Sequence, residues 1–174
     1  MFQKPIISVV VPVHNSQASL KREIELLLDA LFDLTAQPCE VLLIDDGSRD
    51  ATPEVVDELM RQYPQVRSIR HPRRLGSEAA GNTGIQNARG EIVIVQENEQ
   101  PVGSIALRRL FSLVDDKTIL AARAEARRDD SGRRIDTTHH TESRTERPPA
   151  VQMIRRPSAT AGKRSAVRHE KVVG

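Results

Sequence analysis

The sequence is poor in cysteine and aromatic residues, which excludes several classes of protein. Among its 174 residues it has one cysteine, Cys39, no tryptophan, three phenylalanines and one tyrosine. A single cysteine excludes an intramolecular disulfide and leaves a reducing compartment as the default. The lack of a second cysteine also disfavours a structural zinc site. No run approaches the ~18 apolar residues of a membrane span, and the N-terminus lacks a signal-peptide pattern, so we expect a cytoplasmic protein.

Charge is distributed unevenly along the chain. Residues 1–124 contain 14 Lys/Arg and 17 Asp/Glu, a net charge of −3, whereas residues 125–174 contain 12 and 7, a net charge of +5. Apolar periodicity also stops near Glu125, where Arg, Ser, Thr, Pro and Asp begin to dominate. Because such a composition buries little apolar surface, we predict a folded domain over 1–124 and a basic disordered tail over 125–174.

The arginines of this tail suggest anionic partners. They could contact a second chain or the headgroups of the inner membrane surface, which would make the protein peripheral to that membrane. Nucleic acid is disfavoured, because no aromatic residue lies between the arginines to stack on bases.

The stretch Val41–Ser48 organises the rest of the chain. Four aliphatic residues run directly into Asp45, Asp46 and a glycine, a pattern typical of a parallel strand buried on both faces. Similar short apolar runs predict four more strands, and amphipathic patterns between them predict helices. The predicted strands cover 6–11, 66–70, 92–95 and 118–122, and the predicted helices begin near 20, 52, 77 and 104. This alternation predicts an open, mostly parallel α/β sheet with helices on both faces.

Polar residues follow three of the predicted strands. Parallel strands place their carboxyl ends at one edge of the sheet, so residues 12–15, 45–48 and 97–99 should meet around one crevice. Carboxylates from two strand ends, together with the basic loop 71–76, suit a nucleotide, a divalent metal and phosphates. Turn formation is the alternative role for the two aspartates at 45 and 46. Neither G-x-G-x-x-G nor G-x-x-x-x-G-K-[ST] occurs, which disfavours a dinucleotide fold and a phosphate loop.

Three segments in order resemble family 2 glycosyltransferases of the GT-A fold. They are Ser8–Asn15, Val41–Thr52 and Gly76–Glu91, within the matching range 5–101. The resemblance implies a truncated GT-A-like fold that retains the half of the enzyme that binds a UDP- or GDP-linked sugar. It also implies that residues of three loops line this donor: Pro12, Val13 and Asn15 at the base and ribose, Asp45 or Asp46 at the nucleoside, and Arg74, Gly76 and Asn82 near the diphosphate.

The metal motif departs from the family pattern. The family's Asp-x-Asp falls here on Glu97-Asn98-Glu99, in which each carboxylate is one methylene longer. The resemblance implies Mn²⁺ or Mg²⁺ held by Glu97 and Glu99. A solvated acidic loop without metal is the alternative, since a tight oxygen shell tolerates little displacement of its ligands.

The family's acceptor half has no counterpart in this sequence. A positioned carboxylate is needed there to deprotonate the acceptor hydroxyl, and we assign no catalytic base. The predicted function is therefore a family 2 glycosyltransferase that binds a nucleotide-sugar and transfers the sugar to an unidentified acceptor. The alternative is a truncated, non-catalytic relative that acts as a binding or partner module.

Overall fold

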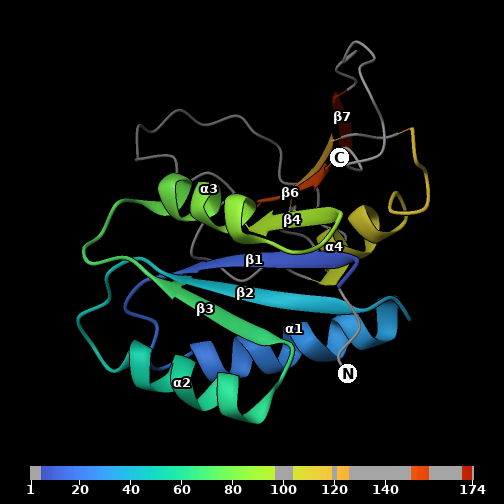
Figure 1. Cartoon of the computed structure of the whole chain (residues 1–174). Helices are drawn as coiled ribbons and strands as arrows, with labels where there is room; N and C mark the ends of the chain where they lie inside the picture. Colours follow the sequence, from blue (N-terminus) through green and yellow to red (C-terminus); the bar gives the residue numbers. More distant parts are fainter. Residues whose placement is uncertain (1–4, 97–103, 119–120, 126–149, 157–169, 174) are drawn as a thin grey trace, which may run out of the picture.

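A computed structural model of the chain describes residues 5–96, 104–118, 121–125, 150–156 and 170–173. The described elements follow in chain order as β1 (Ile7–Val13), α1 (Leu20–Leu34), β2 (Cys39–Asp45), α2 (Thr52–Gln62), β3 (Val66–Arg70), α3 (Ser77–Asn87), β4 (Ile92–Gln96), α4 (Ser104–Phe111), β5 (Ala121–Glu125), β6 (Ala150–Arg155) and β7 (Glu170–Val173). These strands form one sheet in the order β3-β2-β1-β4-β6-β5-β7 (Figure 1). Among the described residues, no helix combines the length and the apolar character needed to cross a bilayer.

The first four strands form a parallel half-sheet. β1 pairs in parallel with β2 on one side and β4 on the other, and β2 pairs in parallel with β3. Every residue of β1 and β4 is buried, as the continuous aliphatic runs predict for strands covered on both faces. The predicted open, mostly parallel sheet with helices on both faces is confirmed.

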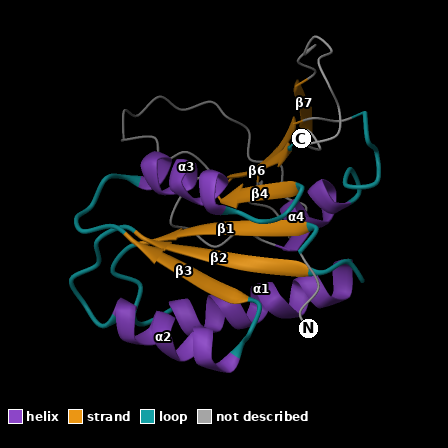
Figure 2. Cartoon of the chain, viewed as in Figure 1, coloured by secondary structure: helices purple, strands orange, loops and turns teal. Residues whose placement is uncertain are grey.

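Two apolar cores cover the two faces of the sheet. Helices α1 and α2 lie on one face and α3 lies on the other (Figures 1 and 2). Alternate β1 side chains divide between them: Val9 and Val11 join the core with α1 and α2, while Val10 joins the core with α3. The small residues of α3 permit close packing, because a Cβ added at Gly84 would overlap the Val10 side chain.

The sequence predicts that the first strand ends before Pro12, but the strand continues past this residue. β1 continues through Pro12 to Val13, and Pro12 pairs in register with Ile44 of β2. The pairing of β1 with β4 stops at Val10. The carbonyl oxygen of Val13 points toward β2, where it accepts the Asp46 N–H at 2.9 Å. Because the backbone groups of successive strand residues point to opposite sides, the Pro12 nitrogen faces β4. The missing N–H therefore removes no hydrogen bond from the ladder with β4.

Two segments within the predicted tail after Glu125 form strands of the sheet. Residues of β6 pair antiparallel with both β4 and β5, and β7 pairs in parallel with β5. Val151 and Met153 of β6 are buried in the core of the α1 face. Arg156 follows β6 and donates hydrogen bonds to the carbonyl oxygens of Ala88, at 2.7 Å, and Ile85 at the end of α3. The division into a domain and a tail at residue 124 otherwise stays a prediction.

A buried polar cluster closes the amino end of the parallel strands. Glu40 Oε1 accepts hydrogen bonds from Ser8 Oγ at 2.6 Å and from the backbone N–H of Arg89 at 2.6 Å. Glu40 Oε2 accepts one from Arg67 Nη1 at 2.8 Å. Burial alone would raise the pKa of Glu40, but these donors outweigh it and hold the pKa below its usual value. The cluster joins β1, β2, β3 and the loop before β4.

Candidate functional site

The carboxyl ends of β1, β2 and β3 lie together at one end of the sheet, which we call the rim. Strand register places Val13 beside Asp45, and Asp45 beside Arg70. The loops that follow these strands therefore lie together, although they are far apart in the sequence (Figure 2). This arrangement is the one predicted for open α/β sheets.

Asp46 is a buried residue that joins three segments of the rim. Its Oδ1 accepts hydrogen bonds from His71 Nδ1 at 2.7 Å and from the backbone N–H of Leu75 at 2.8 Å. Its Oδ2 accepts a hydrogen bond from the backbone N–H of Gly76 at 2.7 Å. On the other side of the imidazole ring, His71 Nε2 lies 2.9 Å from Thr83 Oγ1 on α3. Asp46 thereby holds the loop after β3 against the end of β2.

These contacts also fix the charge of Asp46. Burial alone would raise its pKa, but the donors on His71, Leu75 and Gly76 favour the ionised carboxylate and hold the pKa below its usual value. Because an ionised carboxylate only accepts hydrogen bonds, His71 Nδ1 is the donor in its contact with Asp46.

Asp45 differs from Asp46 because one of its oxygens has no hydrogen bond. Its Oδ1 accepts the backbone N–H of Ser48 at 2.9 Å, but its buried Oδ2 accepts no hydrogen bond from the described residues. Arg70 Nε lies 3.2 Å from Oδ2, an ion-pair contact without hydrogen-bond alignment, and Arg70 Nη2 donates to the Ser48 carbonyl at 3.0 Å. A buried acceptor without a donor is uncommon and costly. Asp45 therefore has the capacity to bind one further donor at the rim.

The loop after β1 completes the rim. Asn15 adopts a left-handed backbone with φ of 49°, a conformation that asparagine tolerates. Its backbone N–H donates to Ser48 Oγ at 3.0 Å, and its Oδ1 accepts the backbone N–H of Arg49 at 2.9 Å. His14 Nδ1 lies 2.9 Å from the Asp46 carbonyl oxygen and is its hydrogen-bond donor. The first two loops are thus fixed to each other before any ligand binds.

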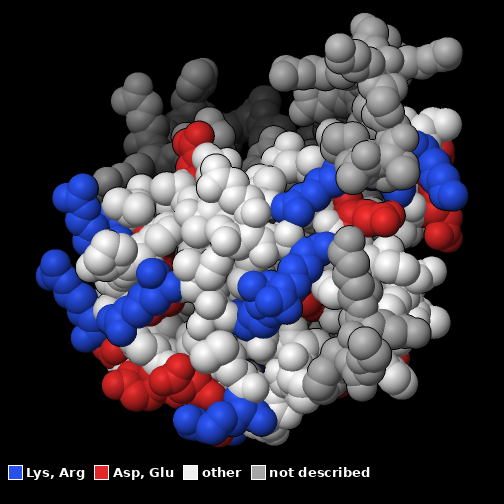
Figure 3. All heavy atoms as spheres, in the orientation of Figure 1, with Lys and Arg blue, Asp and Glu red and all other residues white. Residues whose placement is uncertain are grey.

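Four exposed arginines surround these buried carboxylates. Gly47 has φ of 67°, and a Cβ at this position would overlap the backbone of Arg73 and Arg74, so glycine allows the second and third loops to touch. Arg49 and Arg70 flank the same contact, and all four side chains are exposed. Lys and Arg side chains gather at this end of the molecule, at the left of Figure 3. The rim therefore combines a buried acceptor with exposed cations.

The structure brings the predicted donor-binding residues of the three loops to this rim. Pro12 and Val13 are buried at the end of β1, and Gly76 precedes the first residue of α3. Arg74 lies in the loop before that helix, and Asn82 is exposed on α3 itself. Their roles toward a ligand stay predictions.

The predicted metal ligands cannot be placed. Glu97 and Glu99 directly follow β4 and lie outside the described residues. Within the described part of the chain, no group of three or more His, Cys, Asp or Glu residues gathers to hold a metal ion. Asp116, one of the carboxylates after α4, accepts hydrogen bonds from Thr118 and forms a turn before β5.

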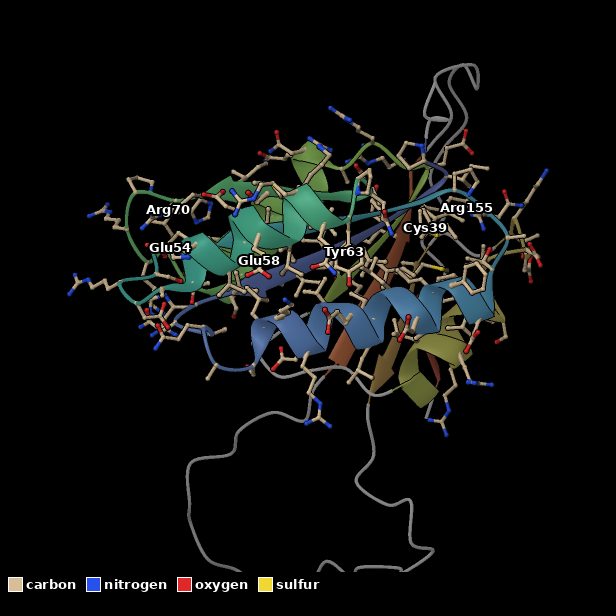
Figure 4. The ribbon with its side chains drawn as sticks, turned by 90° about the horizontal axis from the view of Figure 1, so that it is seen from below. Cys39, Glu54, Glu58, Tyr63, Arg70 and Arg155 are labelled. Carbon is tan, nitrogen blue, oxygen red and sulfur yellow. The ribbon has the colours of Figure 1, made fainter. Side chains whose placement is uncertain are left out.

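Sequence reasoning missed two residues of the rim. The sequence predicts that His71 belongs to a basic loop and that Arg70 is only the last residue of a strand. The structure buries His71 against Asp46. It places Arg70, which Figure 4 labels, against Asp45. For Arg70 a signal was present, because the pairing of β2 with β3 makes the last residues of the two strands neighbours.

Comparison with known proteins identifies the family. The model of glycosyl transferase family 2 matches residues 8–169 of this chain. The chain belongs to this family. Glycosyltransferase GlyG of Streptococcus pneumoniae serotype 4 is 33% identical over 112 residues, which cover 64% of this chain and 36% of that protein. This chain spans about a third of the length of the curated relatives that it matches.

The chain is also similar in fold to solved structures. The crystal structure of residues 1–349 of S. aureus TarS matches with a TM-score of 0.56 at 21% identity, covering 86% of this chain and 46% of that chain. It supports the predicted GT-A-like fold. Mannosyltransferase PcManGT from Pyrobaculum calidifontis, solved in complex with GDP-Man and Mn²⁺, is 27% identical with a TM-score of 0.49, covering 69% of this chain and 35% of that chain.

Proposed function

We propose that the rim binds the nucleotide-diphospho-sugar donor of a family 2 glycosyltransferase. The observation that carries this proposal is the buried Asp45 Oδ2, which accepts no hydrogen bond from the described residues and lies at the carboxyl end of the sheet. A nucleoside supplies N–H and hydroxyl donors for such an oxygen. The exposed guanidinium groups of Arg73 and Arg74 lie in the adjoining loop, at a place suited to the diphosphate. Membership of the family supports the same assignment.

The geometry around Asp45 favours uracil over guanine. Asp45 Oδ1 already accepts the Ser48 N–H, so a base would meet one carboxylate oxygen, Oδ2, which lies against Arg70 and accepts no hydrogen bond from the described residues. Uracil presents a single imide N–H flanked by two carbonyl oxygens. The N–H would donate to Oδ2, and a neighbouring carbonyl would accept from Arg70. Guanine presents two adjacent donors, which need two free acceptors to be satisfied. We therefore propose a UDP-linked rather than a GDP-linked donor.

A divalent metal is part of this proposal. Glu97 and Glu99 would hold it at the end of β4, and it would neutralise charge on the leaving diphosphate. The described residues supply the rest of the site without it: the ionised Asp46 positions the loop that carries the exposed arginines, and Asp45 and Arg70 orient the base.

Transfer of the sugar to an acceptor is the proposed activity. The alternative is a binding or partner module that retains the donor site alone. Both require nucleotide binding at the rim, and they differ in turnover. Release of UDP from a UDP-sugar in the presence of an acceptor separates them, since a binding module holds the donor without consuming it.

Calorimetric titration of UDP and GDP, each with and without Mn²⁺, tests the donor site. We expect UDP to bind more tightly than GDP, and Mn²⁺ to strengthen binding in the wild type but not in a Glu97→Ala, Glu99→Ala double variant. Binding that Mn²⁺ leaves unchanged would remove the metal from the proposal. Absence of binding by both nucleotides, in protein shown to be folded by circular dichroism, would refute the donor site.

A further inference from the structure

The molecule has a second candidate site at the end opposite the rim. A hollow of about 580 Å³ lies between the last turn of α1 and the start of β2. We call it the α1 hollow; its apolar lining is Leu28, Leu31, Phe32, Leu34, Cys39 and Val41. Figure 4 shows Cys39, which lines the hollow, and Arg70, which lies on the rim, at opposite ends of the molecule. An occupant of the hollow would therefore leave the rim accessible.

Phe32 is the most conspicuous residue of the hollow. Its side chain is 87% exposed, although large aromatic side chains are usually buried. Exposed apolar surface beside a concavity is a common feature of binding surfaces. Among the described residues, none covers Phe32, so it is available for an apolar group.

The charged residues of α1 that lie nearest the hollow are acidic. Residues 23–36 contain four Asp/Glu and no Lys or Arg, in a chain whose net charge is +2. Asp29 and Asp33 are both exposed and lie four residues apart on α1, where like charges repel. Asp33 also lies in the last turn of α1, which has no basic residue to complement the negative end of the helix dipole. No ion pair with the described residues compensates these interactions.

We propose that the α1 hollow docks a basic amphipathic segment of a partner protein. One apolar side chain of the segment enters the hollow against Phe32. Flanking Lys or Arg side chains lie over Asp29, Asp33 and the carbonyl end of α1. This partner chemistry follows from the two features together, because the lining takes an apolar group and the surrounding charges select cations over anions. The proposal stands apart from the donor site, which lies at the other end of the sheet.

A pair of synthetic peptides tests the proposal on the full chain. Each peptide is about four helical turns long and carries the same stripe of leucines, with lysines on its polar face in one and glutamates in the other. Binding is measured by the fluorescence anisotropy of the labelled peptide. We expect the lysine peptide to bind and the glutamate peptide not to bind, and binding to weaken as salt screens the exposed charges.

Cys39 reports whether the peptide occupies the hollow. It is the sole thiol of the chain and lines the hollow, and burial raises its pKa to about 11. Alkylation is therefore slow at neutral pH and is best followed near pH 9. The lysine peptide should slow this alkylation, whereas UDP bound at the rim should leave it unchanged.

Matched variants separate the two parts of the surface. Phe32→Ser should weaken binding of the lysine peptide about tenfold, because the exposed aromatic side chain is the expected anchor. Leu26→Ser is its control, since Leu26 is 58% exposed on the same helix and does not line the hollow. An Asp29→Lys, Asp33→Lys variant should no longer bind the lysine peptide. All three changes replace exposed side chains, so the variants should unfold at the temperature of the wild type.

Three outcomes would overturn the proposal. Equal binding of both peptides would show that the charges select nothing. Binding that leaves the alkylation of Cys39 unchanged would place the peptide elsewhere. Protection of Cys39 that grows with protein concentration in the absence of peptide, together with a dimer in analytical ultracentrifugation, would show that a second copy of the chain covers the hollow instead.

Discussion

Replacing Asp46 by alanine should both destabilise the protein and loosen the loop that carries the exposed arginines. The change removes the acceptor of three hydrogen bonds, donated by His71 and by the backbone N–H groups of Leu75 and Gly76. A hydrogen bond to a charged group contributes about 1.5–3 kcal/mol in a buried setting. Leu75 is exposed and Gly76 is half-buried, so water can replace Asp46 at these two N–H groups. We therefore assign most of the loss to the buried His71 contact.

Loss of the three hydrogen bonds should lower the free energy of unfolding by about 3 kcal/mol, a large fraction of the stability of an ordinary domain. For a chain of this size the loss corresponds to a fall of roughly 6–12 °C in Tm. The measurement is guanidinium unfolding followed by circular dichroism at pH 7. Asp57→Ala is the matched control, because Asp57 is exposed in the middle of α2. If Asp46→Ala and Asp57→Ala agreed within about 0.5 kcal/mol, the role assigned to Asp46 would be wrong.

The pH dependence of the same comparison gives an independent check. The pKa of Asp46 is lower in the folded protein than its usual value of 3.8. Its contribution is therefore fully present above that value and is lost as the pH falls through the folded pKa. The stability difference between the wild type and Asp46→Ala should be constant near neutral pH and should shrink below about pH 3.8. A difference that persisted unchanged at lower pH would show that charge plays no part in the contact.

Three further predictions concern the frame of the fold. Gly90→Ala should destabilise the protein by about 1–3 kcal/mol in urea unfolding, because the added Cβ would lie 2.8 Å from the Ile6 carbonyl oxygen; an unchanged midpoint would refute this close approach. Glu40→Gln should cost about 2–4 kcal/mol at pH 7, since Arg67 loses its ionic partner, and this cost should diminish below about pH 4.5 because the pKa of Glu40 is lowered in the folded state. Arg156→Ala should cost about 1–2 kcal/mol and expose the amides of β6 to hydrogen exchange; full protection of β6 in the variant would show that the arginine does not anchor the strand.

The parallel half of the fold was predictable because local signals agreed there. The aliphatic runs at 6–11, 41–44 and 92–95 became buried strands, and β3 has the bounds that its pattern predicts. β6 was missed because its signal is short: Val151 and Met153 are the buried members of an alternating six-residue strand within an arginine-rich stretch. Its pairing with β4 depends on contacts between segments about 60 residues apart, which no local pattern reveals.

The rim was predictable in outline but not in the roles of its residues. The predicted strand order correctly placed Asp45 and Asp46 at the carboxyl ends of the parallel strands. It could not show that Asp46 accepts hydrogen bonds from three donors, while one oxygen of Asp45 accepts none from the described residues. That difference arises from the path of the loop after β3, which turns back over Gly47. No local pattern could show that Gly90 lies in close approach to the start of β1, where an added Cβ would lie 2.8 Å from Ser8 N.

The most direct test of the donor site is a calorimetric titration of UDP into the wild type and Asp45→Asn, with Asp57→Asn as control. The account predicts that Asp45→Asn weakens UDP binding by about 10- to 100-fold, because the free carboxylate oxygen is the proposed acceptor of the base. Asp57→Asn should bind as the wild type does. Unchanged UDP affinity in a folded Asp45→Asn variant would contradict the account, because the buried oxygen would then have no part in binding the nucleoside.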